Sequence, residues 1–225
     1  IRAVCTPGKD SILILPPTYG AYRVFADIND VEVDEVPLLP SFEIDLPALE
    51  RFLSKERDER SEGRLKLLFL CSPNNPTGNS YSLETIEAVL KIFDGLVVLD
   101  EAYYDFSEGE SGVSLLSKYD HLVVLRTLSK AWGLASARVG IAVGSREMVE
   151  VINKIKYPYN LGTPSQALAL RALENAEAVK RSLDEIKRER SRLSGALAAF
   201  GCVRIVYPSD ANFLLLKVDD ATRLY

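Results

Sequence analysis

Residues 125–140 read LRTLSKAWGLASARVG, a polar turn between two apolar runs. The run before the turn, Leu122–Leu125, predicts a buried strand that leads into two hydroxyl groups and Lys130. Burial disfavours the ammonium form of a lysine, and a neutral amine is the form that attacks a carbonyl group. Taken alone, however, a Ser-Lys pair after a strand is more often a solvated turn, because most lysines lie at the surface.

Other groups in the same stretch would suit a phosphate. Thr127 and Ser129 carry the two hydroxyl groups, and Arg138 follows eight residues after Lys130. Hydroxyl and guanidinium groups both donate hydrogen bonds to phosphate oxygens. A cofactor with a carbonyl group and a phosphate tail, pyridoxal 5'-phosphate (PLP), would fit the lysine and these donors together.

Composition excludes several classes of protein. The chain has 225 residues, enough for one large domain or one and a half, and its net charge of −5 provides no basic surface for nucleic acid. No apolar run approaches the ~18 residues of a membrane span. The cysteines are odd in number and far apart, which argues for a reducing, cytoplasmic compartment, and each is expected to be a small buried side chain: Cys5, Cys71 and Cys202. With His121 as the single histidine, expected at the surface, we expect no metal site and no Ser-His-Asp triad.

Strand and helix patterns alternate through the first two thirds of the chain. Apolar runs predict strands at Ser11–Leu15, Val31–Val36, Leu65–Leu70, Leu96–Leu99, Leu122–Leu125 and Val139–Val143. Helices are expected to begin at the caps Thr18, Asp45 and Ser82 and to end near Ile28, Lys55 and Phe93, with a solvated loop at Glu56–Arg64. This alternation predicts an α/β fold with a mostly parallel sheet covered on both faces.

The last third reads differently. Helices are expected at Arg146–Lys156, from Thr163 and at Glu177–Phe200, followed by strands at Cys202–Val206 and Phe213–Val218. We therefore expect a large domain over residues 1–175, and a linking helix with the start of a small C-terminal domain over residues 176–225. Because Ile1–Cys5 resembles the end of a helix and no Met precedes it, both domains are expected to be incomplete, in a piece of a longer protein that is inactive alone.

Four motifs together resemble PLP-dependent aminotransferases of fold type I, over nearly the whole chain. They are Pro-Pro-Thr-Tyr-Gly at 16–20, Ser-Pro-Asn-Asn-Pro-Thr-Gly at 72–78, Asp-Glu-Ala-Tyr at 100–103 and Thr-Leu-Ser-Lys-Ala at 127–131. Within that family the combination is most similar to the histidinol-phosphate aminotransferases. No Gly-x-x-x-x-Gly-Lys loop and no Gly-x-Gly-x-x-Gly fingerprint competes with this interpretation.

The resemblance implies roles around the cofactor ring. Lys130 would bind PLP as a Schiff base and then move the Cα proton of the substrate. Asp100 would face the pyridine nitrogen and keep it protonated, which makes the ring an electron sink. Asn75 and Tyr103 would donate hydrogen bonds to the 3-oxygen, and Tyr19 would stack on the ring. Considered singly, Asp100 would be a helix cap and Asn75 a turn residue. Tyr103 and Tyr19 would be packed aromatic side chains.

The phosphate would be held by Thr127, Ser129 and Arg138. The family usually has Gly-Leu before this arginine, whereas this chain has Ser136-Ala137, and both replacements are small.

The implied reaction moves the amino group of L-histidinol phosphate to 2-oxoglutarate, in a homodimer. Aromatic amino-acid transamination and decarboxylation of a phosphorylated amino acid stay open, because the same residues serve all of these reactions. A non-catalytic regulatory domain of the same fold is a further alternative, against which the acidic charge balance counts.

Overall fold

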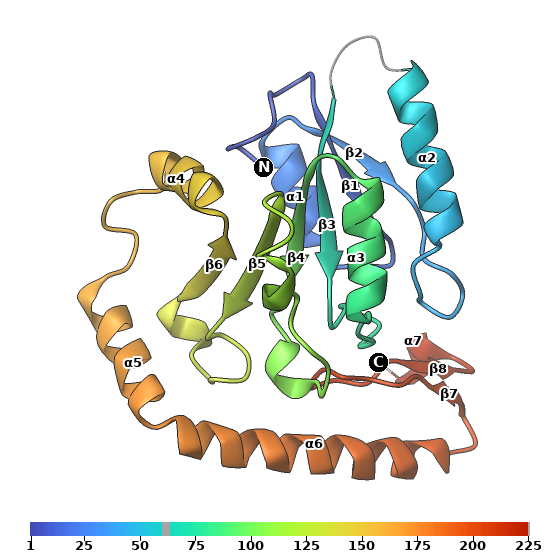
Figure 1. The fold of residues 1–225 in the computed structure, drawn as a ribbon. Coiled ribbons are helices and arrows are strands. Elements are labelled where there is room, and N and C mark those ends of the chain that lie inside the picture. The colour runs from blue at the N-terminus through green and yellow to red at the C-terminus, as the bar shows by residue number, and fades with distance from the viewer. Residues whose placement is uncertain (60–63, 225) are drawn as a thin grey trace.

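The computed structural model of the chain describes residues 1–59 and 64–224 (Figure 1). In these residues a six-stranded sheet has the order β2-β1-β3-β4-β5-β6, in which β1 to β5 are parallel and β6 is antiparallel to β5. The strands are β1 Ser11–Ile14, β2 Glu32–Glu35, β3 Leu65–Cys71, β4 Leu96–Asp100, β5 Leu122–Thr127 and β6 Gly140–Gly144. The mostly parallel α/β sheet expected from the sequence is confirmed, with the half-polar strand β2 at an edge.

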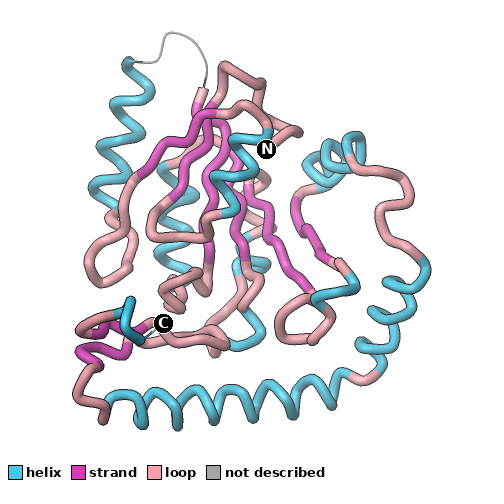
Figure 2. Tube along the Cα trace, turned by 180° about the vertical axis from the view of Figure 1, so that it is seen from behind, coloured by secondary structure: helices cyan, strands magenta, loops and turns pink. Residues whose placement is uncertain are grey.

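Helices cover both faces of the sheet (Figures 1 and 2). Leu13, Leu68 and Val97 point to the face where α2 (Leu46–Glu59) and α3 (Leu83–Ile92) pack. Ile12, Leu67 and Val98, each one residue away along its strand, belong to the cluster that packs on α1 (Ala21–Ile28). Since successive side chains of a strand point to opposite faces, strands buried on both faces read as the continuous apolar runs seen in the sequence.

Two of the three predicted helix caps are in place. The Ser82 hydroxyl accepts a hydrogen bond from the Thr85 N–H at 3.2 Å, and the Asp45 carboxylate accepts one from the Ala48 N–H at 2.9 Å. The prediction for Thr18 is wrong: α1 begins at Ala21 with Gly20 at its N-cap. The Thr18 hydroxyl instead donates to Asn74 Oδ1 at 2.9 Å, so it ties the loop after β1 to the loop after β3.

Other local predictions also need correction. Helix α2 continues to Glu59, past the predicted end at Lys55, because no Gly or Pro occurs there. Of the predicted solvated loop Glu56–Arg64, residues 60–63 lie outside the described residues, and Arg64 is exposed and belongs to no helix or strand. His121 is half-buried, with Nε2 at 3.1 Å from the Leu90 carbonyl oxygen. Cys5 and Cys71 are buried as expected, whereas Cys202 is only half-buried.

The C-terminal third crosses the end of the sheet at which the parallel strands terminate (Figure 1). Helices α4 (Arg146–Ile155) and α5 (Thr163–Glu174) lead into the long α6 (Ala176–Ala198), and then β7 (Val203–Val206) pairs antiparallel with β8 (Leu216–Val218) in a separate sheet. The short helix α7 (Ala221–Leu224) ends the described residues. Strand β8 begins at Leu216 and not at the predicted Phe213, because Phe213 packs against Tyr103. Among the described residues, no helix is long and apolar enough to cross a membrane.

Within residues 1–59 and 64–224, three short 3-10 helices lie between the main elements. They are η1 (Tyr104–Phe106), η2 (Gly112–Leu115) and η3 (Ala135–Ala137). Arg190 of α6 donates to the carbonyl oxygens of Phe106 and Ala211, at 3.1 and 2.8 Å. The long helix is thereby attached to η1, directly after the Asp-Glu-Ala-Tyr motif.

Candidate active site

A cavity of about 360 Å³ lies at the carboxyl ends of β3, β4 and β5, where ligands bind in open α/β sheets. The eight site residues predicted from the sequence come from five separate segments, and all eight line this cavity: Tyr19, Asn75, Asp100, Tyr103, Thr127, Ser129, Lys130 and Arg138. Cys71, Ala102, Leu125, Arg126 and Ala135 complete its wall.

Asp100 ends β4 with its carboxylate held on both oxygens. Oδ2 accepts a hydrogen bond from the Tyr22 hydroxyl at 2.8 Å, and Oδ1 accepts one from the Ala102 N–H at 3.0 Å. Burial raises the pKa of the Asp100 carboxyl, although the two hydrogen bonds and the nearby charge of Lys130 act in the opposite direction. A carboxylate with a raised pKa is a strong acceptor, so Asp100 is suited to hold a proton on a ring nitrogen.

Tyr22 is a partner that the sequence did not reveal. Its ring is 3% exposed and stacks on Phe69 with 4.4 Å between the ring centroids. In the sequence it occupies an apolar position of α1 and reads as a core aromatic. The available signal was its hydroxyl, because a buried tyrosine hydroxyl nearly always has a hydrogen-bond partner.

Lys130 lies exposed at the cavity, so the expectation that it would be buried at the strand end is wrong. Strand β5 already ends at Thr127, and the lysine stands three residues further on, in the turn. The turn is held by the Thr127 hydroxyl, which accepts the Ser129 N–H at 3.1 Å. The Lys130 ammonium lies 5.1 Å from the centroid of the Tyr103 ring.

Tyr103 connects the cavity to the C-terminal segment. Its side chain is buried, and its ring meets the Phe213 ring edge-on with 5.1 Å between centroids. Aromatic pairs favour this T-shaped arrangement. The segment before β8 therefore supports one wall of the cavity.

The loop after β3 places two adjacent asparagines differently. Asn74 is 1% exposed, and its Nδ2 donates to the Pro17 carbonyl oxygen at 2.9 Å and to the Thr77 hydroxyl at 2.7 Å. Asn75 lines the cavity. Gly78 in the same loop has φ +83°, and a Cβ there would lie 2.6 Å from Ser209 Oγ, so this position requires glycine.

Arg138 has a strained backbone. Its φ and ψ of 55° and 43° lie in the left-handed region, which non-glycine residues seldom occupy and which is often found at functional sites. Its Nη1 donates to the Ala135 carbonyl oxygen at 2.9 Å. The preceding Ala137 is buried in a small apolar cluster with Leu128 and Val139, so a small side chain fits at this position.

The donor set fits PLP. The lysine amine matches a carbonyl group, the carboxylate of Asp100 matches a protonated ring nitrogen, and the hydroxyl and guanidinium groups match a phosphate. The cavity volume is within the range of ordinary cofactor sites. Within the described residues, no group of three or more His, Cys, Asp or Glu side chains could hold a metal ion.

The comparisons with known proteins agree with this chemistry. The sequence model of the family "Aminotransferase class I and II" matches residues 1–223. A histidinol-phosphate aminotransferase of Cytophaga hutchinsonii is 45% identical over 225 residues, and that of Christiangramia forsetii is 46% identical over 224 residues. Each match covers 100% of this chain and 62% of the relative, so the chain spans under two thirds of their length.

Solved structures share the fold. The crystal structure of the histidinol-phosphate aminotransferase from Clostridium acetobutylicum has a TM-score of 0.84 at 26% identity, over 94% of this chain and 63% of that one. The enzyme from Sinorhizobium meliloti, in complex with pyridoxal-5'-phosphate, has a TM-score of 0.84 at 23% identity, over 96% of this chain and 57% of that one, and supports the fold alone. The chain therefore belongs to the class I and II aminotransferase family of PLP-dependent enzymes, as its motifs predicted.

Proposed function

We propose that the protein carrying this chain is a PLP-dependent transaminase that moves the amino group of L-histidinol phosphate to 2-oxoglutarate, and that it does so in histidine biosynthesis as a cytoplasmic homodimer. The observation that carries the proposal is the convergence of eight residues from five segments on one cavity. The names of the relatives support the choice of substrate.

The chain's own residues would bind and orient the cofactor. When bound, PLP supplies a carbonyl carbon that takes up the amino group and a ring that accepts the electron pair released at Cα. The Lys130 amine would bind that carbonyl and afterwards carry the Cα proton. Its exposed position suits this second task, because the side chain has to move between two partners.

Fixed groups would keep the ring in place. The Asp100 carboxylate, oriented by Tyr22, would hold the proton on the ring nitrogen. Asn75 and Tyr103 would donate to the ring oxygen, and Tyr19 would cover the ring. Thr127, Ser129 and Arg138 would donate to the phosphate, which the positive charge of the guanidinium also attracts. We further propose that residues 176–225 belong to a second domain, since α6 leads to the separate sheet of β7 and β8.

A panel of amino donors tests the proposal on the full-length protein loaded with PLP. We expect the highest kcat/KM with L-histidinol phosphate, measured as glutamate formed from 2-oxoglutarate. Equal efficiency with phenylalanine would favour an aromatic aminotransferase, and release of CO2 from phosphothreonine would favour a decarboxylase. PLP binding without turnover of any donor would favour the regulatory alternative.

A further inference from the structure

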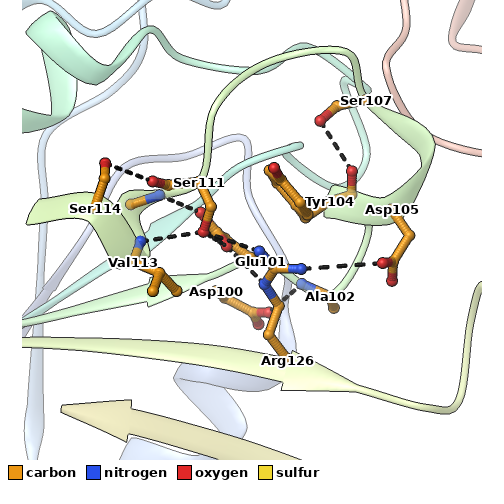
Figure 3. A network of polar contacts seen from close by, with 11 residues as sticks. Asp100, Glu101, Ala102, Tyr104, Asp105, Ser107, Ser111, Val113, Ser114 and Arg126 are labelled. Carbon is orange, nitrogen blue, oxygen red and sulfur yellow. Dashed lines mark hydrogen bonds and ion pairs between the residues drawn. The ribbon is translucent and has the colours of Figure 1, made fainter. Parts of the chain in front are cut away.

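An ion pair lies directly beside the cavity, between Glu101 and Arg126 (Figure 3). The distance from Arg126 Nε to Glu101 Oε2 is 2.7 Å, and the two side chains are 22% and 3% exposed. Glu101 also accepts the Ser111 hydroxyl on Oε2 and the Gly112 N–H on Oε1, both at 2.8 Å. Arg126 Nη2 donates to the same Ser111 hydroxyl oxygen at 2.9 Å, which closes the network.

The pair lies on the opposite side of the strand ends from Asp100. In the parallel register Asp100 lies beside Leu125, and the Glu101 N–H donates to the Leu125 carbonyl oxygen at 2.9 Å. Successive side chains alternate between faces. Asp100 accordingly meets Tyr22 of α1, whereas Glu101 meets Gly112 at the start of η2. A Cβ at Gly112 would lie 2.2 Å from Leu99 Cδ2, so only glycine allows η2 to approach this closely.

Arg126 additionally reaches η1. Its Cζ lies 3.7 Å from the centroid of the Tyr104 ring, and its Nη1 lies 4.0 Å from Asp105 Oδ1. Tyr104 directly follows Tyr103, and Arg126 directly precedes Thr127. One guanidinium therefore joins β5 to three other segments: Glu101 after β4, η1, and Ser111 before η2. Glu101 directly follows Asp100, η1 directly follows Tyr103, and β5 leads to Thr127, Ser129 and Lys130.

Stability alone is a weak explanation for this arrangement. A buried ion pair loses the hydration of two charges, and replacing such a pair by well-packed apolar side chains is often neutral or stabilising. An arginine held by a carboxylate, a hydroxyl and an aromatic ring is instead fixed in one orientation, because its planar fork matches several partners at once. Such a group is suited to set the relative position of the segments that it joins.

We propose that Arg126 and Glu101 are positioning residues that fix the spacing between the groups facing the cofactor ring, Asp100 and Tyr103, and the turn that holds its phosphate and its carbonyl group. They act through these neighbours and determine how tightly the cofactor is held and how it is oriented. The inference rests on the proposed function and adds to it roles for Glu101, which the motif at 100–103 contains but to which the sequence assigned no role, and for Arg126.

The experiment compares variants of the full-length protein. Arg126→Met removes the guanidinium, Arg126→Lys keeps its charge, Glu101→Gln removes the opposite charge, and Ser111→Ala removes only the bridging hydroxyl. Val89→Ala is the matched control, because Val89 is fully buried on α3 away from the cavity and its truncation destabilises through lost packing. For each protein we would measure the PLP dissociation constant, the visible spectrum of bound PLP, kcat and KM, and the melting temperature without PLP.

We expect Arg126→Met to raise the PLP dissociation constant about tenfold or more, which corresponds to the loss of one well-formed charged contact. The visible bands should shift, and kcat should fall with little change in the KM for the amino donor. Arg126→Lys should recover only part of the affinity, because an ammonium lacks the planar fork. Ser111→Ala, the mildest change, should show the same direction of effect at about twofold to threefold. Val89→Ala should lower the melting temperature while its PLP constant and spectrum stay those of the wild type.

The outcomes separate the two proposals. If Glu101→Gln, Ser111→Ala and the Arg126 variants lower only the melting temperature, as Val89→Ala does, the pair is merely structural and the inference is overturned, while the proposed function stands. If the wild-type protein takes up no PLP, the proposed function fails and the inference fails with it.

Discussion

Two pairs of neighbouring residues at the strand ends, Asn74–Asn75 and Asp100–Glu101, differ within each pair in the same way. Asn75 and Asp100 line the cavity. Asn74 and Glu101 lie behind it, 1% and 2% exposed as whole residues. Asn74 bonds to Pro17 and Thr18 in the loop after β1, and Glu101 accepts hydrogen bonds from Ser111 and Arg126. Within each pair, two chemically similar neighbours thus have different positions: Asn75 and Asp100 form the wall of the site, and Asn74 and Glu101 support that wall from behind.

The difference arises from geometry and not from residue type. Along β4, successive side chains point to opposite faces, which separates Asp100 from Glu101. Asn74 and Asn75 lie in the turn after β3, where the hydrogen bonds of Asn74 to Pro17 and Thr77 hold it away from the cavity. The side chain on the cavity face keeps part of its hydrogen-bonding capacity for a ligand, whereas the one behind uses its capacity within the protein. The following predictions test this division, from the largest expected effect to the smallest.

Replacing Lys130 by Ala should have the largest effect on turnover. We expect a loss of about 10⁴-fold or more in kcat, because the amine that carries the proton is gone, while PLP still binds through its phosphate and ring contacts. Borohydride reduction of the wild-type holoenzyme should fix the cofactor to Lys130, as peptide mapping would report. The exposed Lys154 of α4 is the matched control, and Lys154→Ala should keep full activity. A reduced adduct on any other lysine would contradict the assignment.

Asp100→Asn should reduce turnover by about 10²- to 10³-fold, the size typical of a lost preorganised electrostatic contact. The amide keeps the shape of the side chain but cannot balance a protonated ring nitrogen. Kinetics of the full-length variant with saturating PLP would measure the effect. Turnover close to that of the wild type would mean that the ring nitrogen needs no charged partner in this protein.

The asparagine pair should separate stability from cofactor binding. Asn74→Ala removes the hydrogen bonds that this side chain makes with Pro17, Thr18 and Thr77, so we expect a loss of about 2–4 kcal/mol in the free energy of unfolding. Asn75→Ala should leave that free energy unchanged and weaken PLP binding. Urea unfolding without cofactor and PLP titration of both variants would give the two quantities. Equal destabilisation by both substitutions would refute the division between wall and support.

Sequence alone predicted the parts of the molecule that depend on local pattern. The apolar runs marked the strands, and Ser82 and Asp45 marked two helix starts, because a cap bonds to a backbone N–H three residues away. The four motifs, with Arg138 shortly after the last of them, pointed to eight residues, and all eight line one cavity. All of these signals lie within a few residues of the feature that they predict.

What the sequence could not predict depends on partners far along the chain. Thr18 bonds to Asn74, 56 residues away, and not to its own helix. Tyr22 and Asp100 are separated by 78 residues, and Glu101 and Arg126 by 25. No periodicity within one segment identifies such pairs. From the sequence alone, Thr18 is therefore interpreted as a helix cap and Tyr22 as a core aromatic residue, while Glu101 and Arg126 look like ordinary charged residues.

The smallest expected effects concern the two adjacent carboxylates, Asp100 and Glu101. Replacing each by its amide should change the stability of the cofactor-free protein in opposite directions, which tests the division between wall and support directly. Glu101→Gln removes the nearer of the two carboxylates that face Arg126 and leaves Asp105 at 4.0 Å, and we expect a loss of about 1–3 kcal/mol in the free energy of unfolding. Asp100→Asn should instead stabilise the cofactor-free protein. The pKa of Asp100 is raised above its ordinary 3.8 by burial, so the stability that its protonated form provides is present below pH 3.8 and is lost as the pH rises through the raised value. Asparagine does not ionise and avoids that loss. Its oxygen can still accept the Ala102 N–H, and its NH2 group can donate to the Tyr22 hydroxyl, which is able to accept as well as donate. The increase in melting temperature of Asp100→Asn should therefore be seen at neutral pH, at about 2–4 °C for each kcal/mol, and should shrink as the pH falls towards 4.

Thermal melts of both variants without PLP, over a series of pH values, would measure these changes in melting temperature. A lower melting temperature for Asp100→Asn at neutral pH would show that the Asp100 carboxylate, like Glu101, serves the fold, and the comparison of wall and support would no longer hold at β4.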